Sequence, residues 1–366
     1  MKLVIQNSAH VWGGNEKMLA AVAQGMMRRG HDVVVSCAGG VVSERLRDLG
    51  VQVSHFRPRG AIDPVSGLSF TAWLATQRAD ALLLTSWHSI SWSSFGGMVN
   101  RVRKIVMRQG IVRSAPTRGM RGFAVHRWVT DVIVNAPEIR EEWIRTSRGF
   151  PADRVHVVLN GVTSQSADRT ELRKKLRSEL QVDENTVLIG AAGIVAERKG
   201  FDLLLRAFAK VNPSRARLVV IGDGPYLEKL RELAHELNIS PQAHFLGARE
   251  NAAKVIGGLD LFVLSSHNEG MANVMLEAMS AGVPVIASDI SGVRTAIGST
   301  NERPIAGWIF IPGDADSLAE RIGEVVGHLK GNTGSVTERV SEATYRIQKW
   351  FTVDRMLDQT ERILFS

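Results

Sequence analysis

Short apolar runs alternate with stretches of helical spacing along the chain, and this alternation limits the possible folds more than any other feature. The run KLVIQN (2–7) is followed by a glycine-containing turn, a stretch of helical spacing that ends at Gly30, and the run HDVVVSCA (31–38). An order of strand, helix and strand builds a parallel sheet with helices on both faces. The sequence therefore predicts a doubly wound α/β fold.

The same pattern restarts after a polar segment near residues 163–170. TVLIGAAG, GFDLLLRAFAKV and ARLVVIGDG have the spacing of a strand, a helix and a strand, and AHFLG, LDLFVLSS and GVPVIAS predict further strands. The chain has 366 residues, which is longer than most single domains. We therefore expect two Rossmann-like domains, over residues 1–162 and 163–347, with a ligand-binding cleft between their strand ends.

Composition excludes several classes of protein. No apolar run approaches the roughly 20 residues of a membrane-spanning helix. The opening stretch MKLVIQNSAHVWGGNEKM lacks the long apolar region of a signal peptide. The single cysteine, Cys37, excludes a disulfide framework and a cysteine-based metal cluster, and its position after an apolar run predicts a small core residue. We therefore expect a cytoplasmic protein.

Positive charge is concentrated in the first half of the chain. Residues 1–160 hold 21 Lys and Arg against 11 Asp and Glu, so this half is more positive than the whole chain, whose net charge is +8. Between Arg101 and Arg127, eight basic residues meet no acidic one. Such a stretch suits an anionic membrane surface, a phosphorylated substrate or nucleic acid, unless it is only a solvated surface. Nucleic acid is disfavoured because this basic stretch contains a single aromatic residue, Phe123, on which a base could stack.

The stretch SSHNEGMANVMLEAMSAGVPVIAS (265–288) places one acid in a loop and a second acid inside a helix. Glu269 follows an apolar run, a helix is predicted from Asn273, whose side chain suits the N-cap, and Glu277 lies one turn further on. The first turn of a helix binds phosphate through free backbone N–H groups, and Gly270 lets an anion approach them. Carboxylates on either side would repel phosphate but accept hydrogen bonds from hydroxyls. The stretch therefore fits a sugar nucleotide.

Taken singly, Glu269 is equally well explained as a solvated loop acid, and Glu277 as a helix-start acid favoured by the helix dipole. Together with its neighbours, the stretch resembles the E-x7-E motif of the retaining glycosyltransferases of family four, which have the GT-B fold and make bacterial cell-surface polysaccharides and glycolipids. The resemblance implies that Glu269 contacts the donor sugar and Glu277 the ribose. It places the diphosphate on the backbone of Gly270, Met271, Ala272, Asn273 and Val274.

A second segment, GIVAERKGFDLLLRAF, resembles the part of the family that grips the donor diphosphate. The resemblance places Arg198 and Lys199 on that group, where two cations would stabilise the charge that the leaving nucleoside diphosphate gains. Cations at a helix start are otherwise disfavoured by the helix dipole. Many relatives begin this segment with Gly-Arg-Leu, whereas this chain has Gly-Ile-Val, so the cationic role rests on these two residues.

Glycine turns extend the resemblance over most of the chain. WGGNEKML resembles the Gly-Gly-x-Glu turn, which would bring Gly14 to the donor phosphate from the N-terminal domain. VVIGDGPYLEKL resembles the Gly-x-Gly-Pro turn, which assigns Gly222 and Gly224 to the donor site, and AHFLG resembles the strand whose backbone reads the nucleobase, here at Leu246. LNGV, which ends with residues 160–162, resembles the hinge sequence of the family. In relatives the last helix, here about 348–366, packs back on the N-terminal domain.

The acceptor side departs from the family pattern. Relatives often carry a histidine after the strand that here reads KIVMRQG, where this chain has Arg108 and Gln109. His88 lies at the end of an apolar run, although a lone histidine is more often structural. Thr295 stands where relatives often have glutamate. The candidate acceptor-binding residues are Asn15, Glu16, His88, Arg108 and His126.

Competing signals are weaker. GDADSLAERI contains the Asp-x-Asp of a different, metal-dependent glycosyltransferase fold, but its place before an amphipathic stretch predicts a helix N-cap with acids in the first turn. GDGPYL is not the G-x-G-x-x-G of a dinucleotide site, and the chain has no P-loop and no His-x-x-x-His pair. We therefore expect no cofactor and no bound metal.

We expect a metal-independent retaining glycosyltransferase that moves a sugar from a nucleoside-diphosphate sugar, with uridine as the favoured base, to an acceptor hydroxyl in polysaccharide, lipopolysaccharide or glycolipid synthesis. The basic N-terminal domain would hold a lipid-linked or anionic acceptor, and the protein would lie peripherally at the inner face of the plasma membrane. The main alternative is an inactive paralogue that binds sugar nucleotide and scaffolds a partner transferase. A GT-B epimerase or hydrolase is a second alternative, which the complete E-x7-E motif disfavours.

Overall fold

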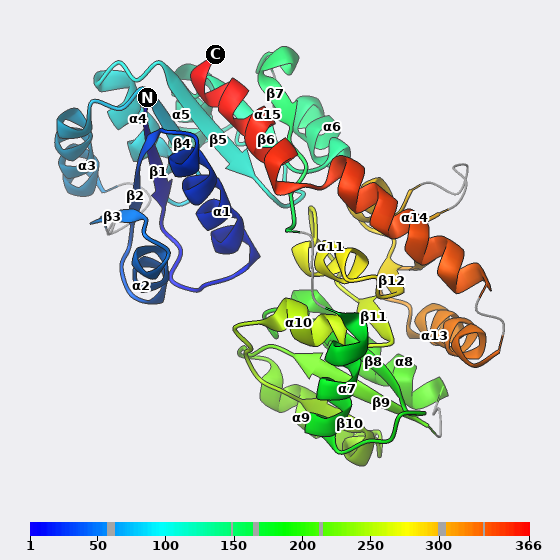
Figure 1. The fold of residues 1–366 in the computed structure, drawn as a ribbon. Coiled ribbons are helices and arrows are strands. Elements are labelled where there is room, and N and C mark those ends of the chain that lie inside the picture. Colours follow the sequence, from blue (N-terminus) through cyan, green and yellow to red (C-terminus); the bar gives the residue numbers. More distant parts are fainter. Residues whose placement is uncertain (57–62, 148, 164–167, 212–214, 299–304, 332–333) are drawn as a thin grey trace. The chain divides into compact units, whose positions relative to one another are not determined.

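The computed structural model describes residues 1–366 except 57–62, 148, 164–167, 212–214, 299–304 and 332–333. The chain divides into two compact units, each with its own parallel sheet (Figure 1). Unit 1 comprises Met1–Gly161 and Val353–Ser366, and unit 2 comprises Val162–Thr352. The polar segment 163–170, which was expected to separate two domains, lies partly outside the described residues.

Unit 1 is a doubly wound parallel sheet with strand order β3-β2-β1-β4-β5-β6-β7. Its strands are β1 (Lys2–Asn7), β2 (Asp32–Cys37), β3 (Gln52–His55), β4 (Ala81–Leu84), β5 (Lys104–Gln109), β6 (Asp131–Val134) and β7 (Val155–Val157). Its helices are α1 (Gly14–Arg28), α2 (Val41–Asp48), α3 (Pro64–Gln77), α4 (Ile90–Val99), α5 (Gly119–Trp128), α6 (Pro137–Thr146), the short η1 (Ala152–Arg154) and α15 (Val353–Phe365).

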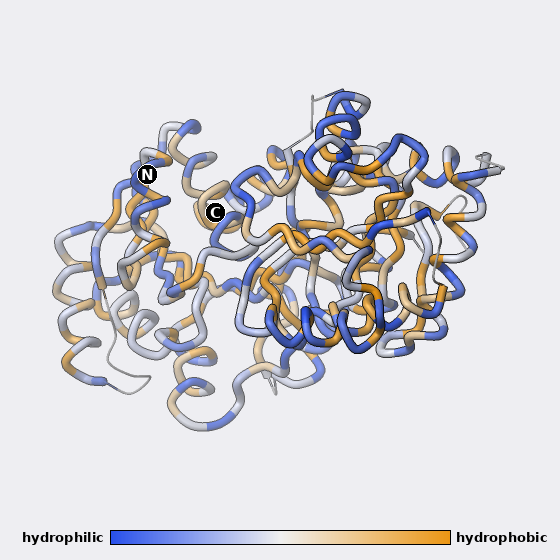
Figure 2. Tube along the Cα trace, turned by 90° about the horizontal axis from the view of Figure 1, so that it is seen from below, coloured by the Kyte–Doolittle hydropathy of each residue, from blue (hydrophilic) through white to orange (hydrophobic). Residues whose placement is uncertain are grey.

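The central strands of unit 1 are mainly apolar because both faces of the sheet are covered. Leu3 and Ile5 of β1 pack with α1, α2 and α15 on one face, while Val4, whose side chain points the other way, packs with α3 to α6. The alternation repeats in β4, with Leu83 on the first face and Leu82 on the second. In Figure 2 hydrophobic stretches alternate with hydrophilic ones along the trace.

Unit 2 repeats this architecture with strand order β10-β9-β8-β11-β12-β13. Its strands are β8 (Val187–Ala192), β9 (Ala216–Ile221), β10 (Ala243–Phe245), β11 (Leu261–Leu264), β12 (Val285–Ser288) and β13 (Trp308–Phe310). Its helices are α7 (Arg169–Leu180), η2 (Glu197–Lys199), α8 (Phe201–Val211), α9 (Leu227–Glu236), η3 (Ser240–Gln242), α10 (Ala252–Gly257), α11 (Asn273–Ser280), α12 (Val293–Ile297), α13 (Ala315–Lys330) and α14 (Gly334–Trp350). The two doubly wound parallel sheets confirm the predicted fold class.

Each sheet reverses its strand order beside its first strand. In unit 1, β1 lies between β2 and β4, and in unit 2, β8 lies between β9 and β11. The loops that follow β1 and β4, or β8 and β11, run to helices on opposite faces and leave a crevice at the carboxyl ends of the strands. Ligands of such sheets bind at this position, which makes these four loops the place to look for function.

Where a single last helix was expected over about 348–366, the structure has the end of one helix and the whole of a second. α14 ends at Trp350 and α15 begins at Val353. Between them, the carbonyl oxygen of Phe351 accepts a hydrogen bond from the backbone N–H of Val162 at 2.8 Å, and Thr352 forms a parallel bridge with the same residue. This pairing engages backbone groups that a continuous helix would need, so the helix stops.

α15 returns to unit 1 and packs against α1 (red and blue in Figure 1). Gly25 of α1 makes room for Leu357, since a Cβ at Gly25 would lie 2.3 Å from a leucine methyl group. At the end of α1, Arg29 donates to Asp358 at 2.6 Å and to Glu361 at 2.5 Å. The docking of α15 therefore combines close apolar packing with a charged pair at its rim.

Two local predictions are confirmed. Cys37 is fully buried in the core of unit 1. Asp314 is the N-cap of α13, and its side chain accepts hydrogen bonds from the backbone of Asp316 and Ser317, which accounts for the Asp-x-Asp sequence. None of the described helices has the length and apolar composition that a membrane span requires.

Candidate functional site

The loops that follow β8 and β11 are joined by close backbone contacts. The hydroxyl of Ser265 donates to the carbonyl oxygen of Lys199 at 3.1 Å. The backbone N–H of His267 donates to the carbonyl oxygen of Arg198 at 2.9 Å. Gly200 turns the chain with φ of +60°, and a Cβ there would lie 2.1 Å from the carbonyl oxygen of Ser265. These contacts hold the backbone of Arg198 and Lys199, the predicted cations, beside the loop that carries Glu269.

Three side chains converge on one carboxylate oxygen. Lys199 Nζ and Arg198 Nη1 both reach Glu269 Oε1, the latter at 3.2 Å, and the hydroxyl of Ser266 donates to the same oxygen at 3.3 Å. The side chains of Lys199 and Glu269 are only 13% and 10% exposed, so each charge depends on the other for compensation. Among the described residues, no group donates to Oε2 of Glu269, which leaves this oxygen available to a ligand hydroxyl.

The helix that follows Glu269 has its N-cap one residue earlier than predicted. Ala272, rather than Asn273, occupies the N-cap position, because its extended backbone turns into α11 and its carbonyl oxygen accepts hydrogen bonds from Met275 and Leu276. Asn273 is therefore the first helical residue and makes no side-chain cap. Gly270, Met271 and Ala272 are buried before the helix, and Asn273, Val274 and Glu277 are half-buried within it. The predicted diphosphate-binding backbone thus forms the start of α11.

A glycine after β12 supports this loop from behind. Gly292 has φ of +74°, and a Cβ there would lie 1.8 Å from the carbonyl oxygen of Gly270. Ser288, the last residue of β12, donates its hydroxyl to the carbonyl oxygen of Ser266 at 2.6 Å. Sequence reasoning missed both supporting residues; the isolated glycine before α12 is the signal that was available.

The predicted glycines after β9 serve close packing. Gly222 and Gly224 have φ of +145° and +157°, and a Cβ at either would lie 1.8 or 2.4 Å from the carbonyl oxygens of Gly193 and Val195. Only glycine lets the loop after β9 approach the loop after β8 this closely. Leu246 donates its backbone N–H to Val220 in β9, at 2.9 Å. The contact of the Leu246 backbone with a nucleobase stays a prediction.

In unit 1, a buried cation lies at the corresponding edge of the sheet. Arg108, in β5, is 8% exposed, and its guanidinium donates to the amide oxygens of Asn160 at 2.7 Å and Asn15 at 3.5 Å. Burial lowers the pKa of Arg108 to about 10, so the side chain still carries its charge at neutral pH. The cation therefore meets amide oxygens where a buried charge usually meets a carboxylate.

Glu16 maintains the glycine turn before α1. One carboxylate oxygen accepts a hydrogen bond from the backbone N–H of Gly13 at 3.1 Å, and the other accepts from the side chains of Asn7 and Asn15 at 3.3 and 3.1 Å. Glu16 is buried, whereas Gly14 and Asn15 are exposed. The structure thus joins three predicted residues, Asn15, Glu16 and Arg108, in one hydrogen-bonded cluster.

The two predicted histidines lie at different edges of the sheet. His88 is exposed and follows β4, at the edge that carries Arg108. His126 is also exposed, but it lies near the end of α5, which runs back towards the amino ends of the strands, and its ring contacts Phe150 with centroids 6.1 Å apart. The structure therefore does not bring His126 to the Arg108 cluster.

Family models match both halves of the chain. Residues 12–166 match the model described as Glycosyltransferase Family 4, and residues 172–328 match the model described as Glycosyl transferases group 1. The first match includes the glycine turn and Arg108, and the second includes the ion cluster and α11.

Curated relatives and solved structures agree with these matches. An uncharacterized glycosyltransferase of Methanocaldococcus jannaschii is 26% identical over 340 residues, which cover 86% of this chain and 85% of the relative. A lipopolysaccharide core biosynthesis glycosyltransferase of Rhizobium meliloti is 29% identical over 150 residues, 41% of this chain and 42% of the relative. The chain spans about half of two further relatives, 49% and 54% of their lengths.

The crystal structure of HepE from Anabaena, in complex with UDP and glucose, superposes on this chain with a TM-score of 0.85 at 20% identity. The alignment covers 100% of this chain and 99% of that chain. The likeness confirms the predicted GT-B fold.

Replacing Gly292 by alanine tests the packing behind the predicted donor loop. The new Cβ would collide with the backbone of Gly270 and would occupy a left-handed conformation. We expect the free energy of unfolding of unit 2 to fall by more than about 1 kcal/mol, measured by urea titration. Gly323→Ala in α13 is the matched control, because its Cβ would meet no atom within 4 Å. Equal stability of the two variants would contradict the packing argument.

Proposed function

The chain belongs to glycosyltransferase family four, and on that premise we propose that it transfers a sugar, with retention of configuration, from a UDP-sugar to an acceptor hydroxyl. The observation that carries the proposal is the cluster of Arg198, Lys199 and Glu269 beside the start of α11. Uridine is proposed as the base because the solved structure of HepE, which has the same fold, contains UDP and glucose.

The donor diphosphate would lie between the two cations and the backbone of 270–274. As the phosphate arrives, it replaces the carboxylate of Glu269 as the partner of Lys199 and Arg198, which frees both oxygens of Glu269 for sugar hydroxyls. Glu277, one turn into α11, would accept the ribose hydroxyls. The helix dipole and the two cations both favour the negative charge that the leaving group gains.

The reaction needs no separate protein base. The bond between the anomeric carbon and the phosphate oxygen breaks, the acceptor oxygen bonds to the same carbon on the same face, and the acceptor proton passes to the departing phosphate. Arg198 and Lys199 stabilise that phosphate in the transition state, together by a few kcal/mol, on the order found for other preorganised charge-stabilising groups. These two side chains take the charge-neutralising role that a metal ion has in other transferases.

We propose that the acceptor carries a negative charge near its hydroxyl. Arg108 is a buried guanidinium held by amide oxygens, so an entering carboxylate or phosphate would complete its neutralisation. Asn15 and His88, both exposed at the same edge, are the further candidates for acceptor contact. The similarity to a lipopolysaccharide core biosynthesis glycosyltransferase supports an acceptor in lipopolysaccharide, polysaccharide or glycolipid synthesis.

We also propose that unit 1 contacts an anionic membrane surface through α5 and its neighbours. Met120 and Phe123 of α5 are 46% and 56% exposed, and Arg127, also exposed, follows at helical spacing on the same face. α4 packs beside α5 and exposes Met98 and Val99. Exposed apolar side chains among arginines are typical of helices that bind anionic lipid surfaces.

Lys199→Ala tests the donor site without knowledge of the acceptor. The wild-type protein should be stabilised against heat by UDP, and it should release UDP slowly from its UDP-sugar by hydrolysis. We expect the variant to release UDP more slowly by about tenfold or more, because one of the two leaving-group cations is lost.

Lys210→Ala is the matched control, because Lys210 forms an exposed ion pair with Asp316 on the outside of unit 2. It should hydrolyse the donor at the wild-type rate. A wild-type rate in Lys199→Ala would remove this residue from the mechanism. A wild-type protein that binds UDP but releases none from any UDP-sugar would favour the scaffold alternative.

Arg108→Gln tests the acceptor proposal. The variant keeps a hydrogen-bond donor near Asn160 but loses the charge, so we expect kcat/KM for anionic acceptors to fall by about tenfold or more. The measurement is sugar transfer to a panel of matched anionic and neutral alcohols. The variant should transfer sugar to neutral acceptors at the wild-type rate. Arg103→Gln, which changes an exposed residue, is the control and should use anionic acceptors as the wild type does. An unchanged preference for anionic acceptors would refute the role of Arg108.

The membrane proposal predicts co-sedimentation with vesicles of phosphatidylcholine and phosphatidylglycerol, and little with phosphatidylcholine alone. Because each cation near such a surface contributes about 1 kcal/mol, replacing Arg118 and Arg127 together by glutamine should lower partitioning by about tenfold or more. Arg154→Gln is the control, because it removes an arginine charge in η1, away from α5, and it should leave partitioning unchanged. Binding that is indifferent to phosphatidylglycerol would contradict the proposal.

A further inference from the structure

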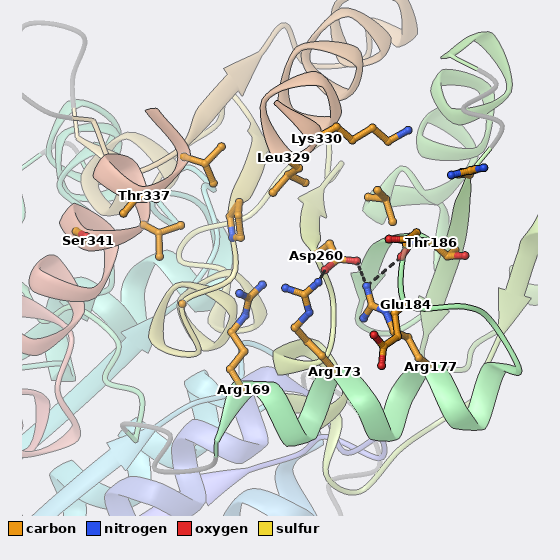
Figure 3. Close-up of a pocket in the computed structure, with 17 residues that line it drawn as sticks. Arg169, Arg173, Arg177, Glu184, Thr186, Asp260, Leu329, Lys330, Thr337 and Ser341 are labelled. Atoms are coloured by element: carbon orange, nitrogen blue, oxygen red, sulfur yellow. Dashed lines mark hydrogen bonds and ion pairs between the residues drawn. The ribbon is translucent and has the colours of Figure 1, made fainter. Parts of the chain in front are cut away.

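A second pocket, of about 740 Å³, lies within unit 2 at the opposite edge of its sheet (Figure 3). Its lining includes Thr186 and Val187 at the start of β8, Asp260 just before β11 and Pro284 just before β12. The predicted donor site, in contrast, follows the carboxyl ends of these strands. A strand rises about 3.3 Å per residue, so the length of β8 separates the two edges by roughly 20 Å. The pocket is therefore distinct from the donor site.

One wall of the pocket is a row of arginines. Arg169, Arg173 and Arg177 recur at every fourth residue of α7, so their side chains leave the helix on one face. Figure 3 shows them extending from α7 into the pocket, towards Asp260. Like charges at this spacing repel each other, so a row of this kind requires negative partners.

The protein supplies one buried carboxylate for this row. Asp260 binds Arg173 at 2.7 Å and Arg177 at 2.5 Å, and it also accepts the backbone N–H of Leu188 in β8 at 2.8 Å. Arg169 pairs with no carboxylate in the part of the chain that the structure describes; it donates to the carbonyl oxygen of Leu259 at 3.0 Å. Asp260 is thus fully engaged in fixing α7 to the sheet, and it neutralises only part of the row.

The remaining charge in the pocket is positive. Among the described residues, its charged lining consists of five cations and two acids: Arg169, Arg173, Arg177, Arg215, Lys330, Glu184 and Asp260. Burial, followed by the neighbouring cations Arg173 and Arg177, lowers the pKa of Arg169, although Asp260 acts in the opposite direction. The pocket therefore attracts anions.

Two buried donors in the arginine row are unsatisfied. Arg177 lines the pocket and is only 6% exposed, yet its Nη1 has no hydrogen-bond partner among the described residues. The same holds for Nε of Arg169. A buried donor without a partner destabilises the folded state, and more strongly when it is charged. An anion with several acceptor oxygens would remove this cost.

The opposite wall is suited to a small organic body. It is formed by the end of α13 and by α14, which contribute Leu329, Val336 and Val340 as apolar side chains and Thr337 and Ser341 as hydroxyls. The labelled residues of this wall face α7 across the pocket in Figure 3. A volume of this size lies in the range of small-molecule sites. An anionic group on the arginines and a polar body against α14 would fill it.

We propose that this pocket is a second ligand site, which binds the phosphate group of a small phosphorylated molecule. Guanidinium groups match phosphate geometry and form paired, charge-assisted hydrogen bonds with it. The site is independent of the donor assignment, because none of its lining residues belongs to the predicted donor or acceptor sets.

Calorimetric titration at constant ionic strength tests the proposal with three probes: inorganic phosphate, glycerol 3-phosphate and glucose 6-phosphate. We expect saturable binding to the full-length protein. Arg169→Gln, which changes a half-buried residue at the start of α7, should weaken binding by about tenfold or more. Lys174→Gln, which changes an exposed residue of the same helix that pairs with Glu171, should bind as the wild type does. Arg198→Gln, which alters the predicted donor site, should also leave this binding unchanged.

The outcomes separate the possible ligands and the possible sites. Tighter binding of the two organic phosphates than of inorganic phosphate identifies a phosphorylated metabolite as the ligand, whereas equal binding identifies the phosphate group alone. Absence of saturable binding for all three probes at millimolar concentration would overturn the proposal. Binding that is lost in Arg198→Gln but kept in Arg169→Gln would also overturn it, because the phosphate would then occupy the donor site.

Discussion

The buried pairing of Lys199 with Glu269 is the interaction on which the predicted donor site depends. It exists because β8 and β11 are neighbours at the point where the strand order reverses, which places the loops after them side by side. A buried charge left without its partner costs several kcal/mol, so acid and cation fix each other before a ligand arrives. A diphosphate can then take the place of the carboxylate, and neither cation passes through an uncompensated state.

Backbone contacts also hold this pair in position. Gly200, Gly222 and Gly292 each lie so close to a neighbouring carbonyl oxygen that a Cβ would overlap it. The loops after β8, β9, β11 and β12 are therefore packed main chain against main chain, with little room for alternative arrangements. Such packing suits a site whose cations must be in place when charge develops, since preorganised groups need not move during the reaction.

The sequence predicts the sheets well and several helices poorly, for physical reasons. Strands covered on both faces are apolar at most positions, so runs such as LDLFVLSS are recognisable without an alignment. α4 is not apparent, because its sequence ISWSSFGGMV buries serines and glycines: Gly97, for example, lies against Ile105. The break between α14 and α15 depends on a pairing with Val162, nearly two hundred residues away. The contact of Arg108 with Asn160 likewise joins residues that no local pattern connects.

Each unit places a cation near the carboxyl edge of its sheet, Lys199 after β8 and Arg108 in β5, but the two cations have different electrical environments. Lys199 in unit 2 meets a carboxylate, whereas Arg108 in unit 1 meets only the amide oxygens of Asn15 and Asn160 among its hydrogen-bond partners. A neutralised cation suits a group that must exchange one anion for another in every catalytic cycle. A buried cation without a carboxylate binds an entering anion with no partner to displace, at a standing cost in stability. This contrast favours unit 2 for the exchanging donor diphosphate and unit 1 for an anionic acceptor.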